Sequence, residues 1–146
     1  MHTQLWRPSQ QDCDAFRHVN NVAYLVQLER IAWAHSAALG IGMAEFEAEN
    51  CALVVRRHEI DYLRPAYVGQ TLRVNTWLDG FDGKCTFWRH YRIFPYISAS
   101  EQHEEDPKQR ILEAKTQWMS VSLDTGRLKR MPATFKAIYR KRHELD

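Results

Sequence analysis

The sequence predicts an α+β fold in which an antiparallel sheet curls around one long helix. Residues 22–39 are rich in helix-forming residues, and their apolar side chains recur every three or four positions. Four later segments are instead rich in β-branched and aromatic residues and are separated by turn sequences. A single helix cannot bury itself, so the strands are expected to pack against it. This pattern alone also allows other α+β sandwiches.

The ends of the predicted helix are marked by capping residues. Asn20 and Asn21 are candidate N-caps, because a side-chain oxygen there accepts a hydrogen bond from a free helix N–H. Gly40 and Gly42 supply the stop. Apolar residues surround much of the helix, which predicts that other structure wraps most of it; they are Val22, Leu25, Val26, Leu28, Ile31, Ala32, Trp33 and Ala37.

The other elements are assigned from composition and turn signals. A short strand is expected at about residues 3–7 and a polar helix at about 43–49. The basic tail, about 133–146, is expected to form a short exposed helix. The link 95–109 is expected to be a solvated hairpin loop whose acidic residues are Glu101, Glu104, Glu105 and Asp106. The four main strands are expected at residues 53–62, 71–81, 84–94 and 110–124.

Length and composition indicate one domain, residues 1–146, with a substantial core. The net charge of +2 and the pI near 8.5 suit an anionic ligand but fall short of a nucleic-acid footprint. Cys13, Cys51 and Cys85 match neither a disulfide framework nor a metal-ligand pattern, so we expect a cytoplasmic protein without a metal. We expect neither a signal peptide nor membrane insertion, since no leader and no run of about 18 apolar residues is found.

The loop before the helix carries the most specific chemistry. It holds a carboxylate, Asp14, close to a helix N-terminus, where unpaired N–H groups and a partial positive charge are found. Such a carboxylate can attack a carbonyl carbon or activate water, while the helix end stabilises the oxyanion. The alternative is that Asp14 only caps a turn.

Residues 14–24, DAFRHVNNVAY, resemble the Asp-x-x-x-His-Val-Asn-Asn-x-x-Tyr signature of hotdog-fold acyl-CoA thioesterases of the 4-hydroxybenzoyl-CoA thioesterase type. The resemblance implies a single hotdog domain, in which a five-stranded antiparallel sheet wraps a long central helix. It also implies that Asp14 is the catalytic carboxylate and that the backbone N–H of Asn21 polarises the thioester oxygen. Arg17 departs from the pattern, because many relatives have glycine at this position.

Three further residues near the motif are candidates for the site. His18 can orient Asp14, hold a water molecule or brace the loop, although a histidine near a helix start often has a structural role. Tyr24 is a candidate substrate contact, and it is interpreted as a packing residue with a satisfied hydroxyl rather than as a catalytic acid. Glu29 matches a position where relatives keep a carboxylate near the acyl pocket, and a solvated or paired glutamate is an equal alternative.

The second predicted strand is unusually charged. By alternation, Arg56 and His58 share one face, and the other face carries Arg57, Glu59 and Asp61. Cross-strand ion pairing is the ordinary interpretation. The alternative is that Arg56 or His58 contacts a polar or carboxylated acyl group.

The resemblance continues in the sequences YLRPA at 62–66, with Gly69, and LDTGR at 123–127. It points to Lys84, in a glycine-containing turn, as a contact for the phosphates of CoA, and less specifically to Arg127, Lys129 and Arg130. Hotdog proteins pair their sheets edge to edge, with active sites at the dimer interface. A homodimer or a dimer-of-dimers tetramer is therefore expected, with the edge of the second strand buried.

The predicted function is hydrolysis of an acyl-CoA to a free acid and CoA, with no cofactor beyond the CoA of the substrate. The alternatives are an acyl carrier protein thioesterase, for which the basic residues 136–142 provide a surface, and a non-catalytic acyl-CoA-binding hotdog protein. The paired Asp/His motif of hotdog hydratases is not found. Nucleic-acid binding is disfavoured, because Tyr139 is the only aromatic residue among the basic residues 136–142.

Overall fold

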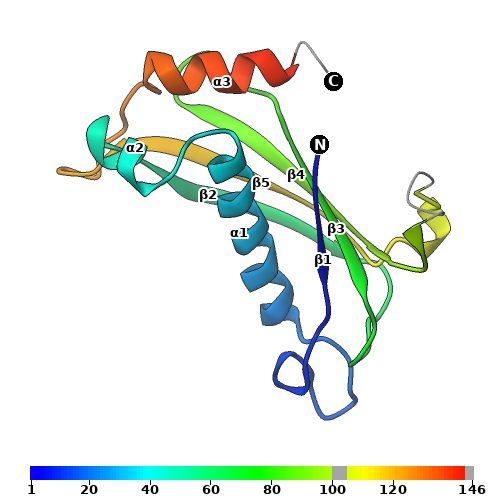
Figure 1. Cartoon of the computed structure of the whole chain (residues 1–146). Coiled ribbons are helices and arrows are strands. Elements are labelled where there is room, and N and C mark those ends of the chain that lie inside the picture. Colours follow the sequence, from blue (N-terminus) through cyan, green and yellow to red (C-terminus); the bar gives the residue numbers. More distant parts are fainter. Residues whose placement is uncertain (100–104, 144–146) are drawn as a thin grey trace.

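The computed structural model describes residues 1–99 and 105–143. Its five strands form one antiparallel sheet in the order β1-β3-β4-β5-β2. Helix α1 lies across one face of the sheet, α3 lies at one end of it, and the loop before α1 lies at the other end (Figure 1). This is the predicted α+β hotdog arrangement. The elements are β1 (His2–Trp6), η1 (Gln10–Asp12), α1 (Asn21–Ala38), α2 (Met43–Ala48), β2 (Cys51–Tyr62), β3 (Leu72–Asp79), β4 (Thr86–Pro95), η3 (Pro107–Gln109), β5 (Leu112–Ser122) and α3 (Ala133–His143).

The caps of α1 follow the sequence signals. Asn20 is the N-cap, because its Oδ1 accepts a hydrogen bond from the N–H of Ala23 at 2.8 Å. At the other end Gly40 has a φ of +88°, a conformation that favours glycine. The N–H of Gly40 bonds to the carbonyl of Ala37, and that of Ile41 to the carbonyl of Ser36, both at 2.9 Å. This is a Schellman motif, and it confirms the predicted stop.

One face of α1 is left uncovered, which corrects the expectation that the helix is wrapped on most sides. Its inner residues, including Leu28 and Ile31, are buried in the main core. In contrast, Val22, Val26 and Trp33 are 68%, 44% and 45% exposed. The reason is that α1 packs over β1 and β3, on the side of the sheet away from β2. No helix within residues 1–99 and 105–143 is both long and apolar enough to cross a membrane.

Within residues 1–99 and 105–143, β2 is an edge strand that pairs with β5 alone. Its register shifts between Val55 and Arg57, which places Arg56 in a β-bulge. Beyond the bulge, the Oε1 of Glu59 lies 2.9 Å from Nη2 of Arg57, and its Oε2 lies 3.2 Å from Nζ of Lys115 on β5. These contacts confirm the predicted ion pairing on this strand.

The C-terminal helix is not the exposed element that its charge predicts. Phe135 and Tyr139 are 2% and 1% exposed. Their rings lie 5.5 Å from that of Phe46 and 5.0 Å from that of Phe87, respectively. Residues four apart lie on one face of a helix, so this pair forms an apolar stripe that seals one end of the sheet.

The acidic link after β4 is likewise not wholly solvated. Glu105 lies over the sheet, where its Oε1 accepts a hydrogen bond from Nδ2 of Asn75 at 2.5 Å. Its Oε2 lies 3.1 Å from Nη1 of Arg92. The partners come from β3 and β4, so the carboxylate neutralises a charge on the outer face of the sheet. The expectations for Glu101 and Glu104 fall outside the described residues.

Candidate functional site

The loop between η1 and α1 is a tight turn closed by Asp14. Its Oδ1 accepts hydrogen bonds from the N–H groups of Phe16, at 2.9 Å, and His18, at 3.2 Å. The N–H of Asp14 also donates to the carbonyl of His18 at 2.9 Å. Its other carboxylate oxygen, Oδ2, makes no hydrogen bond with the described residues, and the side chain is exposed. One oxygen is therefore fixed, while the other is open to water or a substrate.

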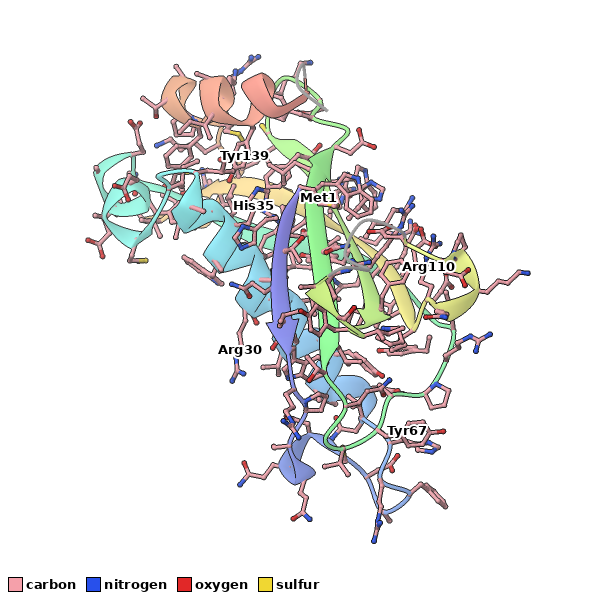
Figure 2. The ribbon with its side chains drawn as sticks, turned by 45° about the vertical axis from the view of Figure 1, so that its right-hand side comes forward. Met1, Arg30, His35, Tyr67, Arg110 and Tyr139 are labelled. Carbon is pink, nitrogen blue, oxygen red and sulfur yellow. The ribbon has the colours of Figure 1, made fainter. Side chains whose placement is uncertain are left out.

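The turn is held against the link between β2 and β3. The N–H of Val19 donates to the carbonyl of Ala66 at 2.8 Å, and His18 forms a β-bridge with Tyr67. The His18 ring meets the Tyr67 ring edge-on at 4.9 Å. His18 thus braces the loop, and its recorded hydrogen bonds to Asp14 use the backbone. Tyr67 marks this end of the molecule in Figure 2.

The N-terminus of α1 follows directly and offers free donors. The N–H groups of Asn21 and Val22 make no hydrogen bond with residues that the structure describes, because the Asn20 cap engages Ala23. They can stabilise an anion at this helix end. The hollow beside Asp14 is lined by Gln10, Cys13, Arg17 and Val68, so Asn21 lies outside its lining.

Tyr24 is buried one turn into the helix and is 3% exposed. Its ring lies 5.8 Å from that of Trp6 and 5.7 Å from that of Tyr62. Burial raises the pKa of Tyr24 to about 12, so its hydroxyl stays protonated at neutral pH. Tyr24 therefore packs in the core beneath the start of α1.

Glu29 on α1 and His58 on β2 are both exposed. Nδ1 of His58 is 2.7 Å from Oγ1 of Thr116 on the neighbouring strand. Burial lowers the pKa of His58, and the carboxylate of Glu29 opposes that shift. The two residues are therefore within electrostatic reach of each other. Arg56, at the exposed bulge, has no recorded contact with either of them.

Lys84 lies at the end of the sheet opposite Asp14. Its N–H donates to Oδ1 of Asp82 at 2.7 Å, and its carbonyl accepts from the N–H of Met131 at 2.8 Å. These bonds place it in the turn between β3 and β4, beside the segment that leads into α3 (Figure 1). Lys129 has a structural contact, because its Nζ bonds to the carbonyl of Glu49 at the end of α2. A single chain therefore does not bring Lys84 to Asp14.

Sequence reasoning missed a buried arginine. Arg89 of β4 is 2% exposed, and its Nη1 is 2.7 Å from Nδ1 of His35 and 3.3 Å from Oγ1 of Thr76. It lines a pocket of about 270 Å³ between α1, α2 and the sheet. Alternation along β4 was the available signal, because it places Arg89 on the inward face between Phe87 and Tyr91. The apolar lining of the pocket includes Trp33, Phe46, Leu53, Phe87, Trp118 and Leu123.

Comparison with known proteins agrees with this architecture. A 1,4-dihydroxy-2-naphthoyl-CoA thioesterase from Synechocystis superposes with a TM-score of 0.76 at 16% identity, over 94% of each chain. A DHNA-CoA thioesterase from Staphylococcus aureus gives 0.81 at 16% identity, over 98% of this chain and 91% of its own. Another Staphylococcus aureus protein, solved in complex with CoA, gives 0.80 at 15% identity, over 96% and 84%. At these identities the likeness shows the fold.

Family membership rests on the sequence itself. No curated protein matches the chain. Residues 8–138, however, match the thioesterase-like superfamily. This range includes the Asp14 turn, α1 and all of the sheet except β1. The protein therefore belongs to the thioesterase-like superfamily.

Proposed function

We propose that this protein hydrolyses an acyl-CoA thioester to the free acid and CoA. The observation that carries the proposal is the Asp14 carboxylate, whose Oδ1 is fixed by two backbone N–H groups while its Oδ2 is open. Membership of the thioesterase-like superfamily supports thioester hydrolysis, and the similar fold solved with CoA supports a CoA ester as the substrate.

Two routes are available to Asp14. As a nucleophile, Oδ2 attacks the thioester carbon, the C–S bond breaks to release CoA, and water hydrolyses the resulting mixed anhydride. As a general base, Oδ2 takes a proton from the water that attacks the same carbon. In both routes the thioester oxygen becomes negative, and the free N–H of Asn21 is the proposed donor to it. The proposed chemistry uses no cofactor, since CoA enters as part of the substrate.

The proposed functional unit is a homodimer formed through β2, with a dimer of such dimers as the larger assembly. Among the described strands, β2 has a partner on one side only, so its other edge is open over a twelve-residue strand, and unprotected edges of that length recruit other strands. Val54 and Val55 on β2 are exposed, as are Val22, Val26 and Trp33 on α1. A second copy would cover this apolar surface.

A two-fold pairing of β2 also explains the separation of Asp14 from Lys84. Antiparallel pairing of β2 with its own copy sets the Cys51 end of one strand beside the Tyr62 end of the other. The Asp14 loop contacts the link that follows Tyr62, whereas Lys84 lies near the Cys51 end, because its neighbour Cys85 bonds to Ser120 of β5, two residues from the partner of Cys51. The partner subunit's Lys84 would then lie on the same side as this chain's Asp14, where it can approach the CoA phosphates.

The test is release of free thiol from a panel of acyl-CoAs with acetyl, medium-chain, long-chain, benzoyl and dicarboxylic acyl groups. Asp14→Asn should reduce turnover at least about 100-fold, the scale of losing a positioned acid–base group. Asp12→Asn is the matched control, since Asp12 accepts from the Ser9 N–H at 2.9 Å and caps η1; it should stay within a few-fold of wild type. Near-wild-type hydrolysis by a folded Asp14→Asn variant would refute the role of Asp14. A carrier-protein thioester included in the panel would reveal that alternative substrate.

A further inference from the structure

Arg89 places a positive charge in an apolar interior. The pocket that it lines lies between α1, α2 and the strands β2, β4 and β5, and its lining is almost entirely apolar. Three of its lining residues, Trp33, Met43 and Leu123, are exposed, so the pocket opens to the surface. A buried guanidinium that lines such a pocket requires an explanation, because an interior position without an opposite charge is costly.

No carboxylate of the described chain compensates this charge. Both hydrogen-bond partners of Arg89, His35 and Thr76, are uncharged in this arrangement. A guanidinium only donates, so Nδ1 of His35 must accept, which makes the imidazole neutral. The ionisable neighbours of Arg89 are the hydroxyls of Tyr91 and Tyr139, and burial raises the pKa of both.

The guanidinium of Arg89 also has N–H groups that can donate to a ligand. Both of its hydrogen bonds use Nη1, and within residues 1–99 and 105–143 none is recorded for Nε or Nη2. These two N–H groups point along one edge of the guanidinium, where they match the two oxygens of a carboxylate. His35 and Thr76 hold the other side of the group, so this edge has a fixed orientation.

We propose that this pocket binds the carboxylate end of an aliphatic chain, with the carboxylate on Nε and Nη2 of Arg89 and the chain against the apolar lining. A free medium-chain acid and the ω-carboxylate of a dicarboxylic acyl group both present this chemistry. A neutral acyl chain of the same length leaves the charge uncompensated and is the poorer ligand.

The acyl-group version rests on the proposed function and its dimer. Within one chain the pocket lies near His35, toward the end opposite the Tyr67 loop (Figure 2). Two-fold pairing of β2 brings the partner subunit's Asp14 toward the Cys51 end of this chain, where Ala52 and Leu53 line the pocket. An acyl chain could then place its thioester at the partner subunit's Asp14 and its far end at Arg89.

The first test measures binding without any hydrolysis. Decanoate and 1-decanol are titrated into wild type and Arg89→Met, and tryptophan fluorescence is followed, because Trp33 and Trp118, two of the five tryptophans, line the pocket. The Kd for decanoate should rise at least about tenfold in Arg89→Met, while that for 1-decanol should be unchanged. Arg30→Met is the matched control, since Arg30 is exposed and points away from the sheet (Figure 2); it should bind both ligands like wild type.

The Arg89→Met variant is expected to fold, because replacing a buried charge with a hydrophobic side chain is often neutral for stability. Arg89→Lys is the second variant: it keeps the charge but loses the paired donors, so it should bind decanoate with intermediate affinity. Equal decanoate binding by wild type and Arg89→Met would overturn the proposal. So would wild type that binds 1-decanol as tightly as decanoate. A third result would also overturn the proposal: Arg89→Met dissociates a dimer but binds decanoate with unchanged affinity. That result would show that a second subunit supplies the charge opposite Arg89.

A second arm distinguishes the two sources of the carboxylate. If the ligand is an acyl group, kcat/KM for ω-carboxydecanoyl-CoA relative to decanoyl-CoA should fall at least about tenfold in Arg89→Met. If that ratio is unchanged while decanoate binding is lost, the site serves a free acid. Because the first arm needs no turnover, it decides the proposal even if no acyl-CoA is hydrolysed.

Discussion

Arg17 holds a backbone conformation that disfavours any residue with a Cβ, and glycine at this position is expected to stabilise the protein. Its φ is +62°, inside the turn that Asp14 closes. The turn requires this conformation, because the N–H of Arg17 donates to the carbonyl of Asp14 and its carbonyl accepts from the N–H of Val68. The backbone, rather than the side chain, is therefore the source of the strain.

The expected gain follows from two opposing effects. The left-handed conformation costs a non-glycine residue about 1–2 kcal/mol. Glycine removes that cost but gives the unfolded chain more freedom, worth about 0.5–1 kcal/mol. The net increase in the free energy of unfolding should be about 0.5–1 kcal/mol, which in a chain of this size corresponds to a Tm rise of about 1–4 °C.

Urea unfolding followed by tryptophan fluorescence, at one protein concentration, measures this difference. Arg17→Ala is the first control, because it removes the side chain but keeps the Cβ and should give no gain. Asn50→Gly is the second control: Asn50 has a φ of +47°, but asparagine tolerates this region, so glycine should not stabilise it. An equal gain from Arg17→Ala and Arg17→Gly would refute the backbone argument.

Two further predictions concern pH and the C-terminal helix. Burial lowers the pKa of His58 and of His90. The unfolded chain therefore takes up more protons than the folded chain as the pH falls through about 6.5. As a result, the free energy of unfolding should decrease from pH 7 to pH 5. The variant carrying His58→Gln and His90→Gln should show a smaller decrease in urea midpoint, and an equal decrease would contradict the assignment. Phe135→Ala should cost about 3–5 kcal/mol of unfolding free energy, because the ring is 2% exposed in the core, whereas Lys136→Ala should change it by less than about 0.5 kcal/mol. A loss below about 1 kcal/mol for Phe135→Ala, measured by the same urea unfolding, would mean that α3 does not contribute to the core.

The parts of the fold that sequence predicts well are those set by short-range contacts. The N-cap at Asn20 and the stop at Gly40 depend on residues within five positions of each other, so the chain specifies them locally. The same holds for the Asp14 turn, which is closed by hydrogen bonds to residues two and four positions away. Strand alternation on β2 likewise predicted that Arg57 and Glu59 share a face, although not the bulge that displaces Arg56.

The predictions of exposure were wrong where a few side chains make buried contacts that the average composition of their segment does not indicate. The tail is rich in basic residues, and its charge hid the pair Phe135 and Tyr139, which is spaced to form one buried stripe. The acidic link contains Glu105, whose burial depends on Asn75 and Arg92, two residues of other strands. In both cases the decisive contact is distant in sequence, and composition carries no information about it.

Glu29 and His58 show what would have been needed to predict the rest of the site. The carboxylate of Glu29 influences the pKa of His58 only because the fold brings exposed positions of α1 and β2 near each other. That placement is a property of helix packing, for which periodicity specifies the buried face but not the crossing. Arg89 differs, because alternation alone assigns it to the inward face between two aromatic residues. A charged residue at such a position must meet a hydrogen-bond partner, a second subunit or a ligand. Inward-facing charges on predicted strands are therefore worth separate attention in this superfamily, since they can indicate a ligand site even where no motif marks one.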